Sequence, residues 1–440
     1  MSVSFEAVRG HTCDRNNILR GENMKKAIKC GKLFDSTTAK VLENKVVIVD
    51  GKKIEAVMNA SEFSSDEGYE VIDLSDKFVL PGLIDCHMHL GFKGLASSMM
   101  ERILSTHGDL ALVSLKNAQK HLMAGFTTVR NCGSAGFTDV AVREAINKGE
   151  FCGPRIKACG PALGSTGGHT DSNVNPHITH YPSGDASLIV DSPDEARKAA
   201  RYVIKHGGDL IKFMATGGVM SRGTTLGAQQ LTYNEIRAIC EIAEMYGVHT
   251  ATHAHGTNGI KDAVRAGVTS VEHGMMMDEE CVELMVKHGT YLSPTIIAAK
   301  RIVDNGIEAG IPEYAVEKAK VAISNHEWGF RKCLAAGVPI VFGTDCGTPF
   351  NLHGEQYDEF TYLMDFGMNH TQAILAATEV AAKLLRMWDE VGSVTAGKYA
   401  DIVAVDGDPM SNIKDLEKMS FIMKDGRVYK NPHWPPRRSW

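Results

Sequence analysis

Hydrophobic positions in the middle of the chain fall into short continuous runs, separated by longer stretches in which apolar residues recur with a helical period. Each short run is typical of a buried strand, and each longer stretch is typical of an amphipathic helix. The predicted strands are Gly82–His87, Thr127–Asn131, Ile156–Gly160, Leu210–Met214, Val248–His253, Ser270–His273, Tyr291–Pro294 and Ile340–Thr344. Predicted helices between them include Asp194–His206, Tyr233–Tyr246 and Asp278–His288. Eight alternations of strand and helix predict an α/β fold, a (β/α)8 TIM barrel over residues 81–385.

Short strands separated by turns occupy both sides of this middle region. Before it lie three predicted strands, Ala27–Cys30, Lys45–Val49 and Lys53–Val57, with Asp50-Gly51 as a hairpin signal between the last two. After it, the same pattern returns at Ile402–Val405 and Phe421–Met423. We therefore expect a small β-sandwich domain built from both chain ends, from residues 24–80 and 386–430. Residues 1–23 are expected to form an N-terminal extension and residues 431–440 an irregular tail.

Composition and charge exclude several classes of protein. A net charge of −6 over 440 residues argues against a protein that binds nucleic-acid phosphates. The sequence has no run of 18 apolar residues and no apolar run near its start, so neither a membrane span nor a signal peptide is predicted. The ten cysteines lack a regular spacing, which indicates reduced thiols in a cytoplasmic protein. Cys86 and Cys346 are expected to be small buried residues.

Metal-binding residue types gather at the ends of the predicted barrel strands, where TIM-barrel active sites form. His87 and His89 end the first strand, and side chains two residues apart on a strand point the same way. The other candidates are Lys212 on strand four, His253 and His255 on strand five, His273 on strand six and Asp345 after strand eight. A single residue of this kind has an ordinary structural explanation, such as packing, an ion pair or a helix cap. Their joint position at one face predicts a metal site.

Two segments resemble the amidohydrolase superfamily. The run Pro81-Gly82-Leu83-Ile84-Asp85-Cys86-His87-Met88-His89 resembles its first-strand signature. The segment from Gly392 to Val403 resembles the closing segment that returns to the β domain, and the resemblance extends over about residues 25–430. Within the superfamily, a strand-four lysine is similar to that of the two-metal members, in which CO₂ carboxylates the lysine and both ions share it.

This resemblance implies a ligand set and a mechanism. His87, His89 and Asp345 would hold one ion, His253 and His273 the other, and carboxylated Lys212 would bridge them. Zinc suits this mixture of nitrogen and oxygen ligands, although manganese, cobalt and iron stay open. Two divalent ions lower the pKa of a bridging water so that hydroxide forms at neutral pH, and one ion polarises the scissile carbonyl. Asp345 would take the water's proton and pass it to the leaving nitrogen.

The position of His255 leaves two interpretations open. It points to the same face as His253 and would serve either as the ligand in its place or as a substrate contact. We prefer His253 as the ligand because it lies deeper in the strand. His255 is then expected to contact the substrate.

Two glycine-rich loops point to a substrate class. Gly167-Gly168-His169 follows strand three, and Gly217-Gly218-Val219-Met220-Ser221-Arg222 follows strand four. This pair of loops resembles the prolidase-like dipeptidases, the arginine or lysine carboxypeptidases and the ochratoxin-type amide hydrolases. The resemblance implies a dipeptide or an N-acyl amino acid as the substrate. Arg222 would either grip its carboxylate bidentately or pair with a neighbouring acid, and His169 would hydrogen-bond the amide or the oxyanion.

Other functions stay open at this point. A related barrel could hydrolyse another small amide, a lactam, a urea or a carbamate, as imidazolonepropionase-like and phenylurea-hydrolase-like proteins do. Imidazolonepropionase-type members resemble the one-metal pattern, so Lys212 weighs against them. A non-catalytic barrel scaffold should have lost at least one ligand, and here none is missing. We expect a homo-oligomer that acts on a small-molecule substrate and binds neither nucleic acid nor membrane.

Overall fold

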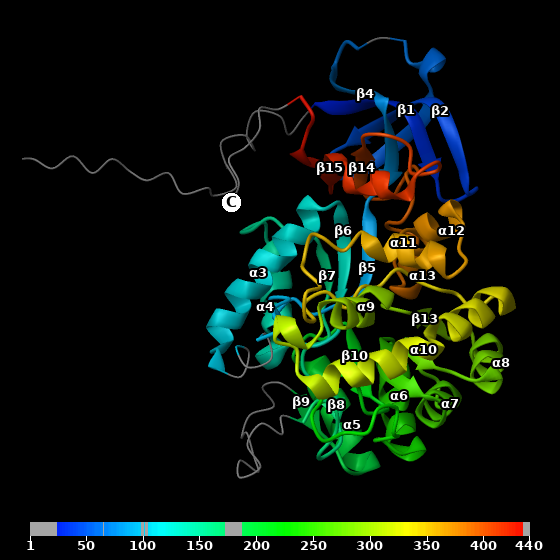
Figure 1. Cartoon of the computed structure of the whole chain (residues 1–440). Helices are drawn as coiled ribbons and strands as arrows, with labels where there is room; N and C mark the ends of the chain where they lie inside the picture. Colours follow the sequence, from blue (N-terminus) through cyan, green and yellow to red (C-terminus); the bar gives the residue numbers. More distant parts are fainter. Residues whose placement is uncertain (1–23, 65, 98–100, 102–103, 172–186, 434–440) are drawn as a thin grey trace, which may run out of the picture.

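The structure, a computed structural model, describes residues 24–64, 66–97, 101, 104–171 and 187–433 (Figure 1). The expected N-terminal extension lies outside the described residues, as does most of the expected tail. Within the described part, strands and helices give the α/β class that the sequence predicts. None of the helices in these ranges combines the length and the hydrophobicity that crossing a membrane requires.

The β domain is one seven-stranded sheet that contains both chain ends, seen as the blue and red strands that lie together in Figure 1. The expected β-sandwich has two packed layers. The observed strands are all hydrogen-bonded into one sheet, because β4 pairs with β1 on one side and with β14 on the other, so the sandwich is observed only in part. The sheet order is β16-β15-β14-β4-β1-β2-β3. Its strands are β1 (Lys25–Asp35), β2 (Lys40–Asp50), β3 (Lys53–Asn59), β4 (Tyr69–Pro81), β14 (Ile402–Val405), β15 (Met419–Lys424) and β16 (Arg427–Lys430).

The middle of the chain forms two parallel sheets. One has the order β5-β6-β7 and the other the order β13-β12-β11-β10-β8-β9. The strands are β5 (Leu83–Met88), β6 (Phe126–Asn131), β7 (Arg155–Lys157), β8 (Ala162–Gly164), β9 (Ser187–Ile189), β10 (Leu210–Met214), β11 (His249–Gly256), β12 (Ser270–Met276) and β13 (Tyr291–Ser293). The third predicted strand, Ile156–Gly160, is thus replaced by two short strands, β7 and β8.

The eighth predicted strand, Ile340–Thr344, is not a regular strand. Its backbone nevertheless bonds to both sheets: Val341 N–H donates to Leu292 O of β13, and Cys86 N–H of β5 donates to Phe342 O, both at 2.9 Å. An extended strand cannot continue past Thr344, because the backbone of Asp345 is in the left-handed conformation with φ 58°. The segment therefore lies between the two sheets and brings Asp345 to the end of β5.

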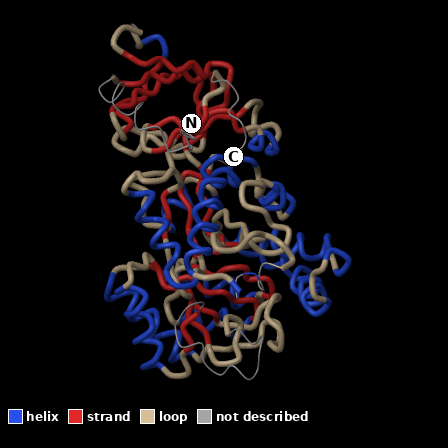
Figure 2. The backbone as a smooth tube through the Cα atoms, turned by 90° about the vertical axis from the view of Figure 1, so that its left-hand side faces the viewer, coloured by secondary structure: helices blue, strands red, loops and turns tan. Residues whose placement is uncertain are grey.

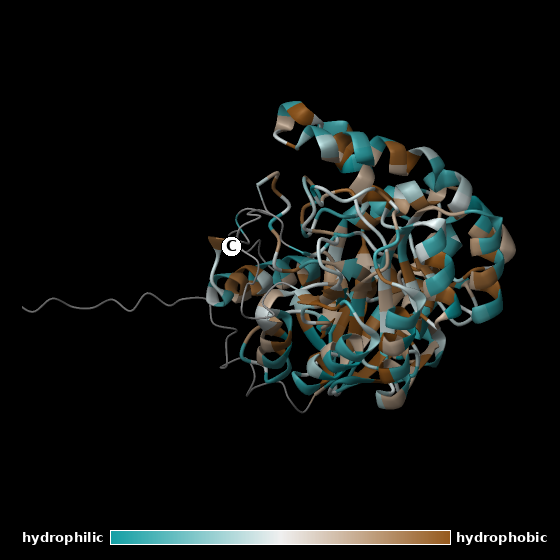
Figure 3. Ribbon diagram, turned by 90° about the horizontal axis from the view of Figure 1, so that it is seen from below, coloured by the Kyte–Doolittle hydropathy of each residue, from teal (hydrophilic) through white to brown (hydrophobic). Residues whose placement is uncertain are grey.

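Helices cover the parallel strands, as the blue segments around the red strands in Figure 2 show. They are α3 (His107–Met123), α4 (Thr138–Asn147), α5 (Pro193–Lys205), α6 (Tyr233–Tyr246), α7 (Thr257–Arg265), α8 (Glu279–His288), α9 (Ile296–Asn305), α10 (Glu313–Ala336), α11 (Asp358–Asp365), α12 (His370–Ala376) and α13 (Glu379–Leu384). Short 3₁₀ turns lie at η1 (Ala60–Glu62), η2 (Ala135–Phe137), η3 (Ile307–Ala309) and η4 (Ile413–Glu417). Seen from below, hydrophobic segments gather among the strands in the middle of the picture, and the helices around them carry both hydrophilic and hydrophobic segments (Figure 3).

Local signals explain why some elements have the predicted bounds. Helix α6 begins after Thr232, whose hydroxyl accepts from Glu235 N–H while the Glu235 carboxylate accepts from Thr232 N–H. It ends at Gly247, which takes the left-handed conformation that glycine adopts without strain. At the junction of β4 with β5, Gly82 lies against Thr127, where an added Cβ would be 2.1 Å from the hydroxyl oxygen. Only glycine lets the chain pass here from the β domain into the parallel strands.

Candidate metal centre

The predicted ligands lie together at the carboxyl ends of the parallel strands. β5 contributes His87, with His89 directly after it, β10 contributes Lys212, β11 His253 and β12 His273. Each of these side chains except that of His89, which is 16% exposed, is buried. Because neighbouring parallel strands end at the same edge, residues far apart in sequence meet here.

The first group is formed by His87, His89 and Asp345, whose ligand atoms all lie within 4.8 Å of one another. Nε2 of His87 is 3.5 Å from Oδ1 of Asp345, and Nε2 of His89 is 3.1 Å from the same oxygen. The left-handed backbone at Asp345 makes this possible, because it lets Asp345 N–H donate to His87 O at 2.7 Å. The carboxylate is thereby turned back toward the two imidazoles.

The other ring nitrogen of His87 is held by a buried acid. Nδ1 lies 2.7 Å from Glu272 Oε2, so Nδ1–H donates a hydrogen bond to the carboxylate and the Nε2 lone pair faces Asp345. Glu272 in turn accepts from Arg130 at 2.7 Å and from Ser270. Burial raises the pKa of Glu272, but the Arg130 charge and the hydrogen bond from His87 outweigh it and hold that pKa well below its usual range.

The sequence predicts no role for Arg130 or Glu272. Glu272 directly precedes His273, and adjacent strand residues ordinarily face opposite sides. The left-handed backbone of His273, with φ 71°, breaks this alternation, so both side chains reach the site. No sequence pattern signals such a residue.

The second group is formed by three histidines. The ring centroids of His253 and His273 are 4.6 Å apart, and His255 lies 4.6 Å from His253 and 5.2 Å from His273. The two groups are adjacent, because the rings of His87 and His273 are 5.0 Å apart. Both His253 and His255 lie beside His273, so the structure does not distinguish which of the two is the ligand.

Lys212 is a buried amine without a partner. Its side chain is 1% exposed, and none of the described residues hydrogen-bonds its Nζ. Its charge contributes to the pKa of the groups around it, among them His87, His169, His253, His255, His273 and Asp345. His253 Nε2 and His255 Nδ1 are likewise buried without hydrogen-bond partners among the described residues. A set of unsatisfied buried donors and acceptors around one point is what metal ligands present in the absence of their ions.

Burial keeps these imidazoles neutral. It lowers the pKa of His87 to about 4 and that of His255 to about 3, and it holds those of His253 and His273 well below the ordinary range. For Asp345, burial raises the pKa, but the hydrogen bond with His89 and the charges of His87 and His89 lower it overall. Neutral imidazoles and an ionised carboxylate are the forms that bind a divalent cation.

Of the predicted substrate contacts, His169 lies among the predicted ligands, and Arg222 is exposed on the segment that follows β10. The ring of His169 stacks on that of His253, with centroids 4.2 Å apart and an interplanar angle of 19°. Its Nδ1 lies 2.9 Å from Ser221 Oγ, and burial lowers its pKa to about 4. Arg222 is exposed and makes no ion pair with any described residue, so the alternative of a pairing acid finds no support in this part of the chain.

The cysteines near the site are small buried residues, as predicted. Cys86 and Cys346 are fully buried, and burial holds the pKa of each thiol well above its usual value. All nine described cysteines are free thiols. These cysteines therefore form no disulfide frame.

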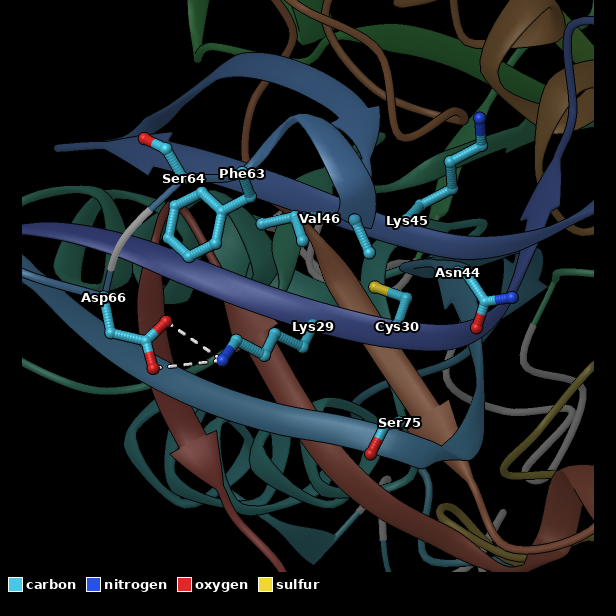
Figure 4. A pocket seen from close by; sticks show the side chains of 10 residues that line it. Lys29, Cys30, Asn44, Lys45, Val46, Phe63, Ser64, Asp66 and Ser75 are labelled. Atoms are coloured by element: carbon cyan, nitrogen blue, oxygen red, sulfur yellow. Dashed lines mark hydrogen bonds and ion pairs between the residues drawn. The ribbon is translucent and has the colours of Figure 1, made fainter.

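A cavity of about 440 Å³ lies away from these residues, on the sheet of the β domain (Figure 4). Lys29 points across it to Asp66, with 2.9 Å between the ammonium and the carboxylate. None of the residues that line it is a predicted ligand or substrate contact. This cavity does not mark the metal centre.

The sequence and the fold are similar to those of known proteins. The pattern of the Amidohydrolase family matches residues 78–430. Ochratoxinase from Aspergillus niger is 30% identical over 380 residues, which cover 80% of this chain and 76% of that protein. The crystal structure of a Xaa-Pro dipeptidase with methionine bound in its active site has a TM-score of 0.85 at 36% identity, covering 92% of this chain and 100% of that one. A prolidase complexed with N-methylphosphonate-L-proline has a TM-score of 0.84 at 30% identity and covers 92% of this chain and 100% of that one. The chain therefore belongs to the amidohydrolase family and is an enzyme of that family.

Proposed function

We propose that this enzyme is a two-metal hydrolase that cleaves the amide bond of a dipeptide or an N-acyl amino acid. The observation that carries the proposal is the buried amine of Lys212, which has no hydrogen-bond partner among the described residues. A buried charge without a partner is costly. Attack of the neutral amine on CO₂ would form an N–C bond and release a proton, and the resulting carbamate anion would be compensated by two cations. Lys212 is thus suited to stand between two ions.

The neighbouring residues fit two ions. His87, His89 and Asp345 would hold one, His253 and His273 the other, and carboxylated Lys212 would be shared. These nitrogen and oxygen ligands suit zinc. When bound, two such ions supply a water of lowered pKa and a Lewis acid for the scissile carbonyl.

The residues of the chain perform the proton transfers and hold the substrate. The lowered pKa of Asp345 keeps its carboxylate ionised at neutral pH, so it accepts a proton from the attacking water and delivers it to the leaving nitrogen. The neutral rings of His169 and His255 donate N–H groups toward the carbonyl oxygen as negative charge develops there. Arg222, exposed and without an ion pair to a described residue, binds the substrate carboxylate.

Two relatives support the substrate class. One is named ochratoxinase and another a Xaa-Pro dipeptidase, and the chain spans more than three quarters of each. An N-acyl amino acid and a dipeptide share an amide bond next to a free carboxylate. A neutral donor at His169 and a cation at Arg222 suit that pair of groups.

The proposal also covers the architecture around the site. We propose that the parallel strands and the 340–344 segment belong to one (β/α)8 barrel over residues 81–385; the bonds of that segment to both β13 and β5 support this arrangement on one side of the barrel. We propose residues 24–80 and 386–430 as the bounds of the β domain, whose seven strands all lie within them. The free cysteines support a cytoplasmic location, and we expect the enzyme to act as a homo-oligomer.

The test combines metal analysis with a hydrolysis screen over dipeptides and N-acyl amino acids. We expect about two ions per chain and release of a carboxyl-terminal amino acid. Lys212→Ala and Asp345→Asn should abolish this activity. Two ions without activity on any such compound would move the substrate to another amide, a lactam, a urea or a carbamate. No metal, even after reconstitution, would favour a non-catalytic scaffold.

A further inference from the structure

Beside the predicted ligands, three buried side chains form a row of hydrogen bonds. Gln356 Nε2 lies 2.6 Å from Nδ1 of His121, and Nε2 of His121 lies 2.8 Å from Nδ1 of His353. Nε2 of His353 lies 2.9 Å from the carbonyl oxygen of Phe92. With Cys346, the two histidines also place ligand atoms within 4.8 Å of one another, a spacing that could hold a metal ion.

The hydrogen bonds assign every proton in this row. Gly354 N–H donates to Gln356 Oε1 at 2.8 Å, so the amide nitrogen of Gln356 faces His121 and donates to Nδ1. His121 therefore carries its proton on Nε2 and donates it to Nδ1 of His353. His353 then carries its own proton on Nε2 and donates it to Phe92 O.

This proton arrangement leaves no lone pair for a cation. Both nitrogens of each ring are used, and the Cys346 thiol donates to Asn351 Oδ1 at 3.6 Å. Burial lowers the pKa of His353 to about 3 and holds that of His121 well below its usual value. The row is therefore neutral and fully bonded, and it is not a metal site.

The row joins the two segments that carry the first group of predicted ligands. His353 lies in the segment that follows Asp345. Phe92 N–H donates to His89 O at 3.0 Å, and the two rings pack with centroids 5.5 Å apart. His89 N–H donates to Cys346 O at 2.9 Å. A shift of either segment would therefore separate His89 from Asp345.

Helix α3 anchors this arrangement at two points. His121 belongs to the last turn of α3, and Asn117, one turn earlier, donates to Leu90 O and Phe92 O, both at 2.8 Å. All three members of the row are at most 3% exposed. Such a buried network has one arrangement that satisfies every group.

We propose that Gln356, His121 and His353 are positioning residues of the metal centre. They fix the distance between the segment of His89 and the segment of Asp345 and thereby preorganise the first ion's ligands. The inference rests on the proposed function, because it takes His87, His89 and Asp345 as ligands.

The first test measures zinc affinity by competition with a chromophoric chelator. His121→Phe keeps a ring but removes both hydrogen bonds, and we expect it to weaken binding of one ion by about 10- to 100-fold, the range for residues that orient ligands. Gln356→Leu, which alters neither ring, should shift the affinity in the same direction. His121→Gln, which can still donate and accept, should recover part of the loss.

A matched control separates positioning from stability. His249→Phe makes the same change at a buried histidine at the start of β11, away from the ligand end of that strand. It should leave zinc affinity as in the wild type, even where it lowers the melting temperature. Unchanged zinc affinity in both His121→Phe and Gln356→Leu would overturn the proposal while leaving the proposed function intact.

The second test needs no metal. The imidazole ¹⁵N shifts of the metal-free wild type should show His121 and His353 as neutral rings protonated on Nε2. A proton on Nδ1 of either ring, or a charged ring at neutral pH, would contradict the assigned row by itself. A wild type that binds no zinc overturns the proposed function, and the role of the row with it.

Discussion

His273 and Thr295 both adopt the left-handed backbone conformation, with φ 71° and 50°, and their side chains meet, with 2.6 Å between Nδ1 and Oγ1. Such a conformation costs on the order of 1–3 kcal/mol for each residue that is not glycine. The pairing uses that strained geometry. When the hydroxyl oxygen accepts from Nδ1–H, Nε2 of His273 keeps the lone pair that a metal ligand needs. We expect Thr295 to favour this tautomer once a metal is bound.

Replacing Thr295 tests this selection. Thr295→Val keeps the branched shape and removes the hydroxyl, so Nδ1 of His273 loses its acceptor. We expect zinc affinity to fall by about 10-fold or more, because the ring is then free to change tautomer and to rotate. Chelator competition measures the affinity, with Thr295→Ser as the control that keeps the hydroxyl. Equal affinities in Thr295→Val and Thr295→Ser would show that the hydrogen bond does not orient His273.

Glu359 secures the helix that follows Thr295. Its carboxyl oxygens accept from Ile296 N–H at 2.9 Å and from Ile297 N–H at 2.7 Å, at the first turn of α9. Burial raises the pKa of Glu359 to about 8, above the roughly 4.3 of an unfolded chain. The folded state therefore retains a proton that the unfolded state releases between these values. The contribution of Glu359 to stability is complete below its pKa in the unfolded chain. It is lost as the pH rises through its pKa in the folded chain.

Glu359→Gln removes this titration while keeping an oxygen acceptor. We expect the melting temperature of the wild type to fall more steeply between about pH 5 and pH 8 than that of the variant. Thermal unfolding followed by circular dichroism across that range gives the comparison. If the melting temperatures of the two proteins change with pH in the same way, Glu359 has the same pKa in the folded and the unfolded chain.

The elements that the sequence predicts best are those whose signals are local. Leu210–Met214 forms a strand and Tyr233–Tyr246 a helix with the predicted bounds, because an apolar run and a capping pair act within a few residues. The predicted strand Ile340–Thr344 is less regular than expected, because Asp345 must turn back toward His87. That turn depends on contacts made across the fold.

The predicted ligands were accessible to sequence analysis because strand ends share one face. The residues that orient them were not. Arg130 acts on Glu272 and His121 acts on His353, partners that lie 142 and 232 positions apart. Their pairing follows from how the sheets and α3 pack, and no spacing in the sequence expresses it.

Arg155 connects the β domain to the parallel strands. It is the first residue of β7, and its guanidinium pairs with Asp401 at 2.8 Å and with Asp425, while stacking on Tyr399. The side chain of Asp401 is only 3% exposed. Arg155 is the cation that pairs with Asp401 among the described residues, so its loss would leave this buried carboxylate without that ion pair.

We therefore expect Arg155→Met to lower the free energy of unfolding by about 3–5 kcal/mol, the cost of breaking a buried ion pair on one side. Urea unfolding followed by fluorescence measures the change. The control is Arg197→Met, which breaks a solvent-exposed pair with Glu241 and should cost less than about 1 kcal/mol. Similar losses in the two variants would show that Arg155 contributes no more than a surface ion pair.

His169 is the substrate contact with the best-defined position, because its ring stacks on His253 and its Nδ1 is held by Ser221. At neutral pH the ring is uncharged and keeps one N–H. If this N–H stabilises charge on the substrate oxygen during attack, its removal should act on the transition state rather than on the metals. We expect His169→Ala to lower kcat/KM by about 10²- to 10³-fold, the usual effect of losing one such donor, with two ions still bound. Steady-state kinetics on the substrate found in the screen, together with metal analysis, would measure both. Ser221→Ala keeps the imidazole and should have a smaller effect; an unaltered kcat/KM in His169→Ala would place the oxyanion donor elsewhere, with His255 the next residue to replace.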